Sequence, residues 1–119
     1  MPRNDFAWVE FAHLFTATAP SRTETFNVEG VPVTAGDNTE GYVLVLARDV
    51  QLNSHRIQIN GTDLPQVDIQ PDGAGEWQTW MDRIPNDFLV PGANRITIRR
   101  VGNDDFTISS VVVHWREQG

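Results

Sequence analysis

The chain has 119 residues and contains neither cysteine nor lysine; sixteen acidic residues against nine arginines give a formal net charge of −7. A chain of this length buries roughly two thirds of its unfolded surface, so we expect residues 1–119 to form one domain without disulfides. The acidic charge argues against binding to nucleic acid or to anionic membranes, because both need a basic surface. Residues 1–20 lack a basic segment followed by an apolar run, so we expect neither a signal peptide nor a membrane-spanning segment.

Short apolar segments that alternate with a period of two recur along the chain, and turn residues separate them about every ten positions. This pattern predicts an all-β protein, and eight antiparallel strands favour a β-sandwich of the jelly-roll type. The predicted strands cover residues 6–15, 23–28, 42–50, 55–60, 67–69, 77–84, 95–101 and 106–115.

Two of these segments are apolar on both faces. The segment 6–15 is interrupted only by Glu10 and His13, and an apolar strand of this kind at a sheet edge invites pairing with another chain. The segment 42–50 is the most apolar of all. We therefore expect it at the centre of a sheet, covered at least in part on both sides.

Three short motifs predict how the strands are joined. Asn60-Gly61 is typical of a tight hairpin, because both residues accept a positive φ. Pro91-Gly92 predicts a turn into the strand 95–101. The alternation changes phase between Ile108 and Val111, which predicts a β-bulge near Ser109-Ser110 that keeps both apolar residues inward.

Several segments together resemble the galactose-binding-domain-like jelly rolls, which include many carbohydrate-binding modules. The matching segments are IQING (57–61), WQTWMDRIP (77–85), LVPGANRITI (89–98) and FTISSVVVHW (106–115). The resemblance spans about residues 41–117 and concerns structural positions. It therefore implies the fold and a carbohydrate-binding role, and it assigns no binding residue.

If consecutive strands run in opposite directions, the loops between them alternate between the two ends of the sandwich. Loops 16–22, 50–54, 71–76 and 102–104 fall at one end, and loops 29–40, 61–65 and 85–93 fall at the other with both termini. The resemblance implies a ligand at the end away from the termini, although some related modules use a sheet face.

The end away from the termini gathers amides, carboxylates, an arginine and an aromatic ring, which are the groups that recognise a sugar. The candidate ligand-binding residues are Asn53, Asp72, Glu76, Trp77, Arg100, Asn103 and Asp104. Arg100 is suited to a carboxylated sugar, which it can bind with two hydrogen bonds. The competing interpretation is that these residues serve only as turn formers.

Trp77 and Trp80 lie three positions apart, so the alternation of a strand turns them to opposite faces. One is then a core residue, and the other is partly exposed and offers an aromatic surface to a ligand. A β-bulge between them would instead place both in the core.

Metal and catalytic sites are not indicated. His13, His55 and His114 fall on three different strands without the spacing of metal ligands. The chain lacks a nucleophile elbow, a phosphate-binding loop and a characteristic pair of acids, so we expect a non-enzyme. Asn60-Gly61-Thr62 fits the glycosylation pattern, but we interpret it as turn chemistry.

A structural Ca²⁺ is common in the folds that the chain resembles. Oxygen ligands are available from Asp37, Asn38 and Glu40, or from Asp104 and Asp105. Neither group has the spacing of a defined calcium loop, so we expect no cofactor.

Three functions compete. The first is a non-catalytic module that recognises a carbohydrate through the loops away from the termini. The second is a structural or assembly subunit, of the capsid, tail or surface-layer kind, that acts through contacts with other proteins or with copies of itself. The third is a hydrolase or metal enzyme, which would require a cleft that gathers two histidines and a carboxylate.

Overall fold

The computed structural model describes residues 3–32, 41–52, 55–65, 69, 71, 75–85 and 87–117. These residues form eight strands and no helix, which confirms the predicted all-β class. The strands are β1 (Arg3–Phe15), β2 (Ser21–Val28), β3 (Gly41–Arg48), β4 (His55–Ile59), β5 (Thr62–Asp63), β6 (Trp77–Ile84), β7 (Gly92–Arg100) and β8 (Phe106–Glu117). Because the described residues contain no helix, they contain none that could cross a membrane.

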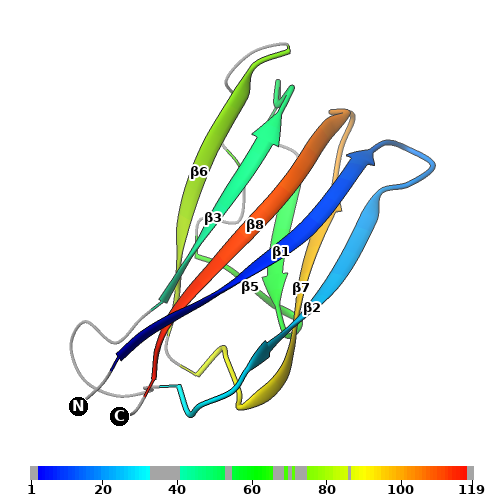
Figure 1. Cartoon of the computed structure of the whole chain (residues 1–119). Helices are drawn as coiled ribbons and strands as arrows, with labels where there is room; N and C mark the ends of the chain where they lie inside the picture. Colours follow the sequence, from blue (N-terminus) through cyan, green and yellow to red (C-terminus); the bar gives the residue numbers. More distant parts are fainter. Residues whose placement is uncertain are drawn as a thin grey trace.

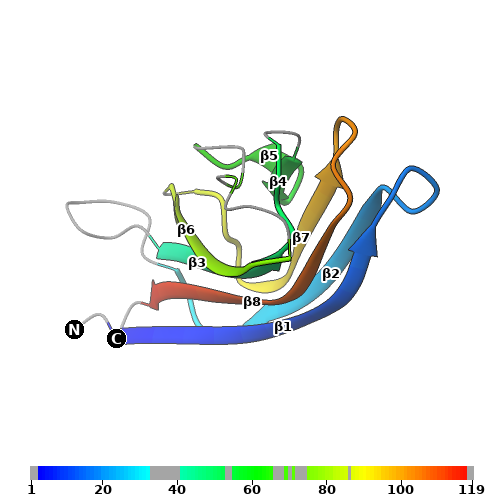
Figure 2. The ribbon, with the colours of Figure 1, turned by 90° about the horizontal axis from the view of Figure 1, so that it is seen from above.

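The strands form two antiparallel four-stranded sheets that pack face to face as a sandwich (Figures 1 and 2). The front sheet has the order β1-β8-β3-β6, and the back sheet has the order β2-β7-β4-β5. The first and last strands of the chain are neighbours, and the chain crosses between the two sheets along its length. This connectivity is the jelly roll that the sequence predicts.

Alternating side chains of both sheets fill the space between them. In the back sheet, Ile96 and Ile98 of β7 are paired with Ile59 and Ile57 of β4, and all four are fully buried. In the front sheet, the inward side chains come from alternate positions of β3 and β8. The interior therefore follows from the period of two in the sequence.

The predicted β-bulge in β8 is present. Leu46 of β3 is paired with Ser110, whereas the next residue, Ala47, is paired with Ile108, so Ser109 is the extra residue. The extra residue restores the inward phase, and Ile108 and Val111 are both buried.

The strand after the Asn60-Gly61 hairpin lies earlier than predicted. Asn60 and Gly61 have φ values of 51° and 87°, which confirms the tight turn. Because this turn reverses the chain within two residues, pairing resumes at once in β5, with Thr62 opposite Ile59. The predicted strand at 67–69 is wrong at Ile69, which is buried but lies outside any strand; residue 67 is not among the described residues.

The strand β3 lies at the centre of the front sheet, between β8 and β6, as predicted. The expectation that both of its faces are covered at least in part holds on the outer face only as partial burial, with Tyr42 and Leu44 half-buried. Among the described residues, no second layer packs on that face, and Leu46 is exposed there. The apolar outer face of the front sheet therefore lies on the surface.

Candidate functional site

The end of the sandwich away from the chain termini is the distal end, and its described loop residues are 16–20, 49–52, 75–76 and 101–105 (Figure 1). Hydrogen bonds join these loops to one another. The Arg100 amide donates to the Pro20 carbonyl at 2.7 Å, and the Asp49 amide donates to the Glu76 carbonyl at 3.0 Å. The grouping of loops predicted by counting strands is therefore present in the fold.

The carboxylate of Asp104 holds the distal loops together from inside. Its Oδ2 atom accepts hydrogen bonds from the backbone amides of Gln51 at 3.0 Å and Leu52 at 3.2 Å. The same oxygen lies 3.2 Å from Nε2 of His55, and both side chains are buried. Asp104 was a predicted ligand-binding residue, but its carboxylate faces the protein interior. Its position suits a residue that shapes the site rather than one that contacts a ligand.

The guanidinium of Arg100 is also engaged within the protein. Its Nε atom donates to the Asp104 carbonyl at 2.9 Å, and its terminal nitrogen pairs with the Asp105 carboxylate at 3.1 Å. The side chain is only 13% exposed. Arg100 therefore fixes the loop before β8, and the two-point contact with a carboxylated sugar that its sequence position suggested is already occupied by protein groups.

A surface hollow of about 510 Å³ opens between the loop after β3 and the loop before β8. It is lined by Asp49, Gln51, Leu52, Asn103, Asp104 and Asp105. The side-chain amide of Gln51 donates to Oδ1 of Asp49 at 3.0 Å, which orders one wall of the hollow. Carboxylate and amide oxygens dominate the lining, so the hollow is suited to a ligand that presents hydrogen-bond donors such as hydroxyl groups.

An exposed aromatic ring lies at the same end of the molecule, on the outer face of the front sheet. Trp77 is 50% exposed and Trp80 is 7% exposed, which confirms that the two tryptophans face opposite sides of β6. The Arg48 guanidinium carbon lies 5.7 Å from the centroid of the Trp77 ring. Asp49, which lines the hollow, bonds to the backbone of residues 75 and 76, immediately before the tryptophan. An aromatic surface and a polar hollow therefore share one end of the molecule.

The other predicted ligand-binding residues divide into two groups. Glu76 and Asn103 are exposed at the distal end, whereas Asn53 and Asp72 lie outside the described residues. The sequence interpretation did not include Asp49 or Gln51, because they follow a strongly apolar strand and resemble its continuation. The sequence holds only a weak signal for Asp49, namely that aspartate accepts a positive φ more readily than most residues. In the structure, Asp49 has a φ of 65°.

The three histidines lie in three separate places. Nε2 of His13 contacts the Ala19 carbonyl at 3.2 Å, His55 lies against Asp104 in the core, and His114 stands on the outer face of the front sheet. Within the described residues, no group of three or more metal-ligating side chains converges. Of the calcium candidates, Asp104 faces inward and Asp105 pairs with Arg100, and residues 37, 38 and 40 lie outside the described part of the chain.

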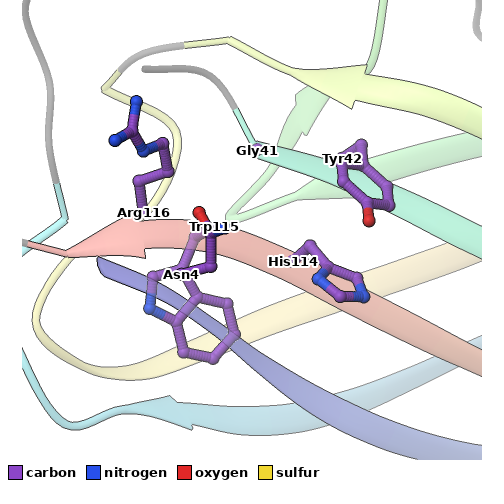
Figure 3. A pocket seen from close by; sticks show the side chains of 6 residues that line it. All are labelled: Asn4, Gly41, Tyr42, His114, Trp115 and Arg116. Atoms are coloured by element: carbon purple, nitrogen blue, oxygen red, sulfur yellow. The ribbon is translucent and has the colours of Figure 1, made fainter. Parts of the chain in front are cut away.

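A second hollow, of about 240 Å³, lies near the chain termini on the outer face of the front sheet. It is lined by Asn4, Gly41, Tyr42, His114, Trp115 and Arg116 (Figure 3). The rings of Tyr42 and His114 stack with centroids 4.5 Å apart, and Figure 3 shows them beside each other on neighbouring strands. No residue of this hollow was among the predicted ligand-binding residues.

The chain belongs to a family of unknown function (DUF7383), whose model matches residues 3–117. A comparison with curated proteins gave no match. Among solved structures, dimeric latent PorU from Porphyromonas gingivalis is similar with a TM-score of 0.73 and 14% identity, over 98% of this chain and 13% of PorU.

A β-porphyranase of glycoside hydrolase family 86 from Bacteroides plebeius is similar with a TM-score of 0.54 and 17% identity, over 96% of this chain and 20% of the enzyme. A family 35 carbohydrate-binding module from Clostridium thermocellum overlaps with a TM-score of 0.46 and 18% identity, over 95% of this chain and 97% of the module. The chain thus spans only a small part of PorU and of the porphyranase. The comparisons concern the fold, and they agree with the predicted jelly-roll β-sandwich.

Proposed function

We propose that this member of the DUF7383 family is a non-catalytic module that binds carbohydrate at its distal end. The observation that carries the proposal is the half-exposed ring of Trp77 at the same end as a hollow lined by carboxylate and amide groups, with Asp49 of the hollow bonded to residues 75 and 76. Sugars present an apolar C–H surface that packs on an aromatic ring and hydroxyl groups that donate to such oxygens. The fold also occurs as a part of a β-porphyranase, which is consistent with a module of this kind.

The charges around the hollow favour a neutral sugar. Asp49 and Asp105 both line it, and the nearby cation of Arg100 is paired with Asp105. A carboxylated or sulfated sugar in the hollow would bring a negative charge close to these carboxylates, whereas Arg48 lies outside the lining, over the Trp77 ring, and donates to the Gly75 carbonyl. We therefore expect neutral oligosaccharides to bind more tightly than acidic ones.

Calorimetric titration with a panel of neutral oligosaccharides tests this function, with Trp77→Ala as the variant and Trp8→Ala as the control. The two tryptophans have similar exposures, 50% and 60%, but Trp8 lies on β1, away from the hollow. We expect Trp77→Ala to weaken binding about tenfold or more, because it removes the stacking surface, and Trp8→Ala to leave affinity within about twofold.

Absence of binding to every neutral sugar in the panel, or equal losses in both variants, would contradict the proposal. Circular dichroism of the two variants establishes that each retains the strand content of the parent chain.

A further inference from the structure

The outer faces of the two sheets differ sharply in chemistry. On the back sheet, most outward side chains are polar, and they include Thr23, Thr25 and Asn27 of β2, Arg95, Thr97 and Arg99 of β7, and Arg56 and Gln58 of β4. On the front sheet, many outward side chains are apolar or aromatic, and Phe6, Trp8 and Met81 are each more than half exposed. An exposed apolar face opposite a largely polar one indicates a contact surface.

Strand pairing arranges outward side chains of the front sheet in four rows, each crossing all four strands. The row nearest the distal end is Leu14-Thr107-Arg48-Trp77. In the order β1, β8, β3 and β6, the other three rows are Phe6-His114-Tyr42-Arg83, then Trp8-Val112-Leu44-Met81, then Glu10-Ser110-Leu46-Thr79. We call the twelve residues of these three rows the aromatic face. It contains one arginine and one glutamate, so its formal charge is zero in a chain whose net charge is −7.

We propose that the aromatic face is an interface between two copies of this chain, related by a two-fold axis that runs parallel to the strands. Such an axis places β1 of one copy over β6 of the other and β8 over β3, so each row lies over its own copy. This is a closed, isologous arrangement of two aligned sheets, which is a common geometry for homodimers and for sheet packing.

The facing residues match chemically in this arrangement. In the central row, Trp8 faces Met81 and Val112 faces Leu44, giving a sulfur–aromatic contact and an aliphatic contact. In the first row, Phe6 faces Arg83, whose aliphatic stem can pack against the ring edge while its charge stays at the rim. Glu10 faces Thr79, so no two like charges meet.

The size of the face is sufficient for association, although it is near the lower limit. Strands about 4.8 Å apart, with a rise of about 3.4 Å per residue, give the three rows a projected area on the order of 400 Å². Because the side chains stand above this plane, two copies bury on the order of 1,000 Å², the size at which specific interfaces begin. The dimer is therefore expected to depend on concentration.

The ring geometry favours a protein surface over a sugar on this face. His114 is stacked between Tyr42 at 4.5 Å and Phe6 at 5.7 Å, with interplanar angles of 12° and 27°. Rings stacked in a row cover one another's faces and present their edges. A sugar requires an open ring face, whereas ring edges and aliphatic side chains pack well against another protein layer.

Sedimentation velocity of the full chain, from roughly 10 µM to 1 mM, tests the proposal. We expect the mass to rise from 13.4 kDa towards twice that value. Trp8→Glu and Met81→Glu, in the central row on opposite strands, should each raise the dissociation constant at least tenfold. Thr25→Glu, on the outer face of the back sheet, adds the same charge and should have no effect. Circular dichroism of each variant monitors folding.

Thiol cross-linking tests the orientation. The chain has no cysteine, so the double variant Trp8→Cys/Met81→Cys carries the only thiols. The two positions lie on opposite edge strands of one sheet, about 14 Å apart, whereas facing positions of two stacked sheets lie about 10 Å apart with their side chains directed at each other. We expect a short bis-methanethiosulfonate reagent, too short to join the two thiols of one copy, to yield a covalent dimer, whereas Thr25→Cys/Gln58→Cys on the back sheet should stay monomeric.

A monomer at every concentration, a dimer insensitive to both glutamate variants, or cross-linking no faster than in the control would each overturn the proposal. Trp77 lies in the adjoining row of the same sheet face, but the glutamate variants alter neither Trp77 nor a residue of the distal hollow. The mass and the sugar affinity are therefore separate readouts, and failure of this proposal and failure of the carbohydrate proposal are separate results.

Discussion

At the scale of single residues, the distal end depends on one buried carboxylate. Asp104 joins the loop after β3, the imidazole of His55 and the start of the last strand. Replacement by alanine leaves two backbone amides and an imidazole without their acceptor in a buried place. We expect Asp104→Ala to lower the free energy of unfolding by about 3 kcal/mol, measured by urea denaturation.

Two further substitutions serve as controls for Asp104→Ala. Asp104→Asn retains a carbonyl oxygen and should be less harmful. Asp105→Ala removes the exposed neighbouring carboxylate, which pairs with Arg100 at the surface, and should cost less than about 1 kcal/mol. Equal losses for Asp104→Ala and Asp105→Ala would contradict the anchoring role of Asp104.

A pair of asparagines explains the glycosylation-like motif at residues 60–62. The side-chain amide of Asn60 donates to the Phe88 carbonyl at 2.8 Å and to Oδ1 of Asn94 at 2.9 Å. Asn94 is buried, and its own amide donates to the carbonyls of Val90 and Gly92. The nitrogen that would carry a glycan therefore donates hydrogen bonds that connect the hairpin after β4 to the turn before β7. This agrees with the interpretation of the motif as turn chemistry.

The candidate site could be predicted from the sequence only in outline. The alternation of β6 correctly separated Trp77 from Trp80, and strand counting correctly brought four loops together. The orientation of Asp104 could not be foreseen, because the phase of alternation is lost in a loop and aspartate is a common turn residue whose side chain can also bond to nearby backbone. Asp49 was not predicted as a site residue for a related reason: it directly follows β3, so the predicted strand 42–50 includes it.

At the scale of elements, β1 is the clearest test of the fold. It forms one edge of the front sheet, and Val9 and Phe11 point inward with exposures of 5% and 2%. Val9→Lys or Phe11→Lys places an unpaired charge in the core. We expect each to lower the free energy of unfolding by about 3 kcal/mol, or the melting temperature by roughly 15 °C in thermal denaturation.

Trp8→Lys is the matched control for these substitutions, because Trp8 precedes Val9 on the same strand but points outward. It should leave the melting temperature within about 3 °C and should affect only association. Unchanged melting temperatures for both core variants would show that β1 is wrongly placed.

The element that the sequence misplaced is β5. The Asn60-Gly61 turn is predicted correctly, but the apolar residues Val67 and Ile69 wrongly predict that the returning strand includes Ile69. Pairing is set by the turn, which forces Thr62 and Asp63 against the end of β4 although both are polar. Ile69 packs into the same core from outside any strand, so burial alone did not reveal its secondary structure.

At the scale of the whole molecule, the two apolar faces of β1 and β3 have a single explanation. The sequence interpretation took the double-sided apolar pattern of residues 42–50 as burial on both sides of one sheet. The fold instead leaves one side of the front sheet open, and this side forms the aromatic face. A single sequence records which side chains are apolar, but it does not distinguish cover by the same chain from cover by another molecule.

The central claim is that sugar binds at the distal end, and backbone amide chemical shifts during titration with a neutral oligosaccharide test it most directly. The account predicts that the largest changes fall on residues 49–52, 75–77 and 100–105, around the hollow and Trp77. Changes confined to the aromatic face, or no change at saturating sugar, would contradict it.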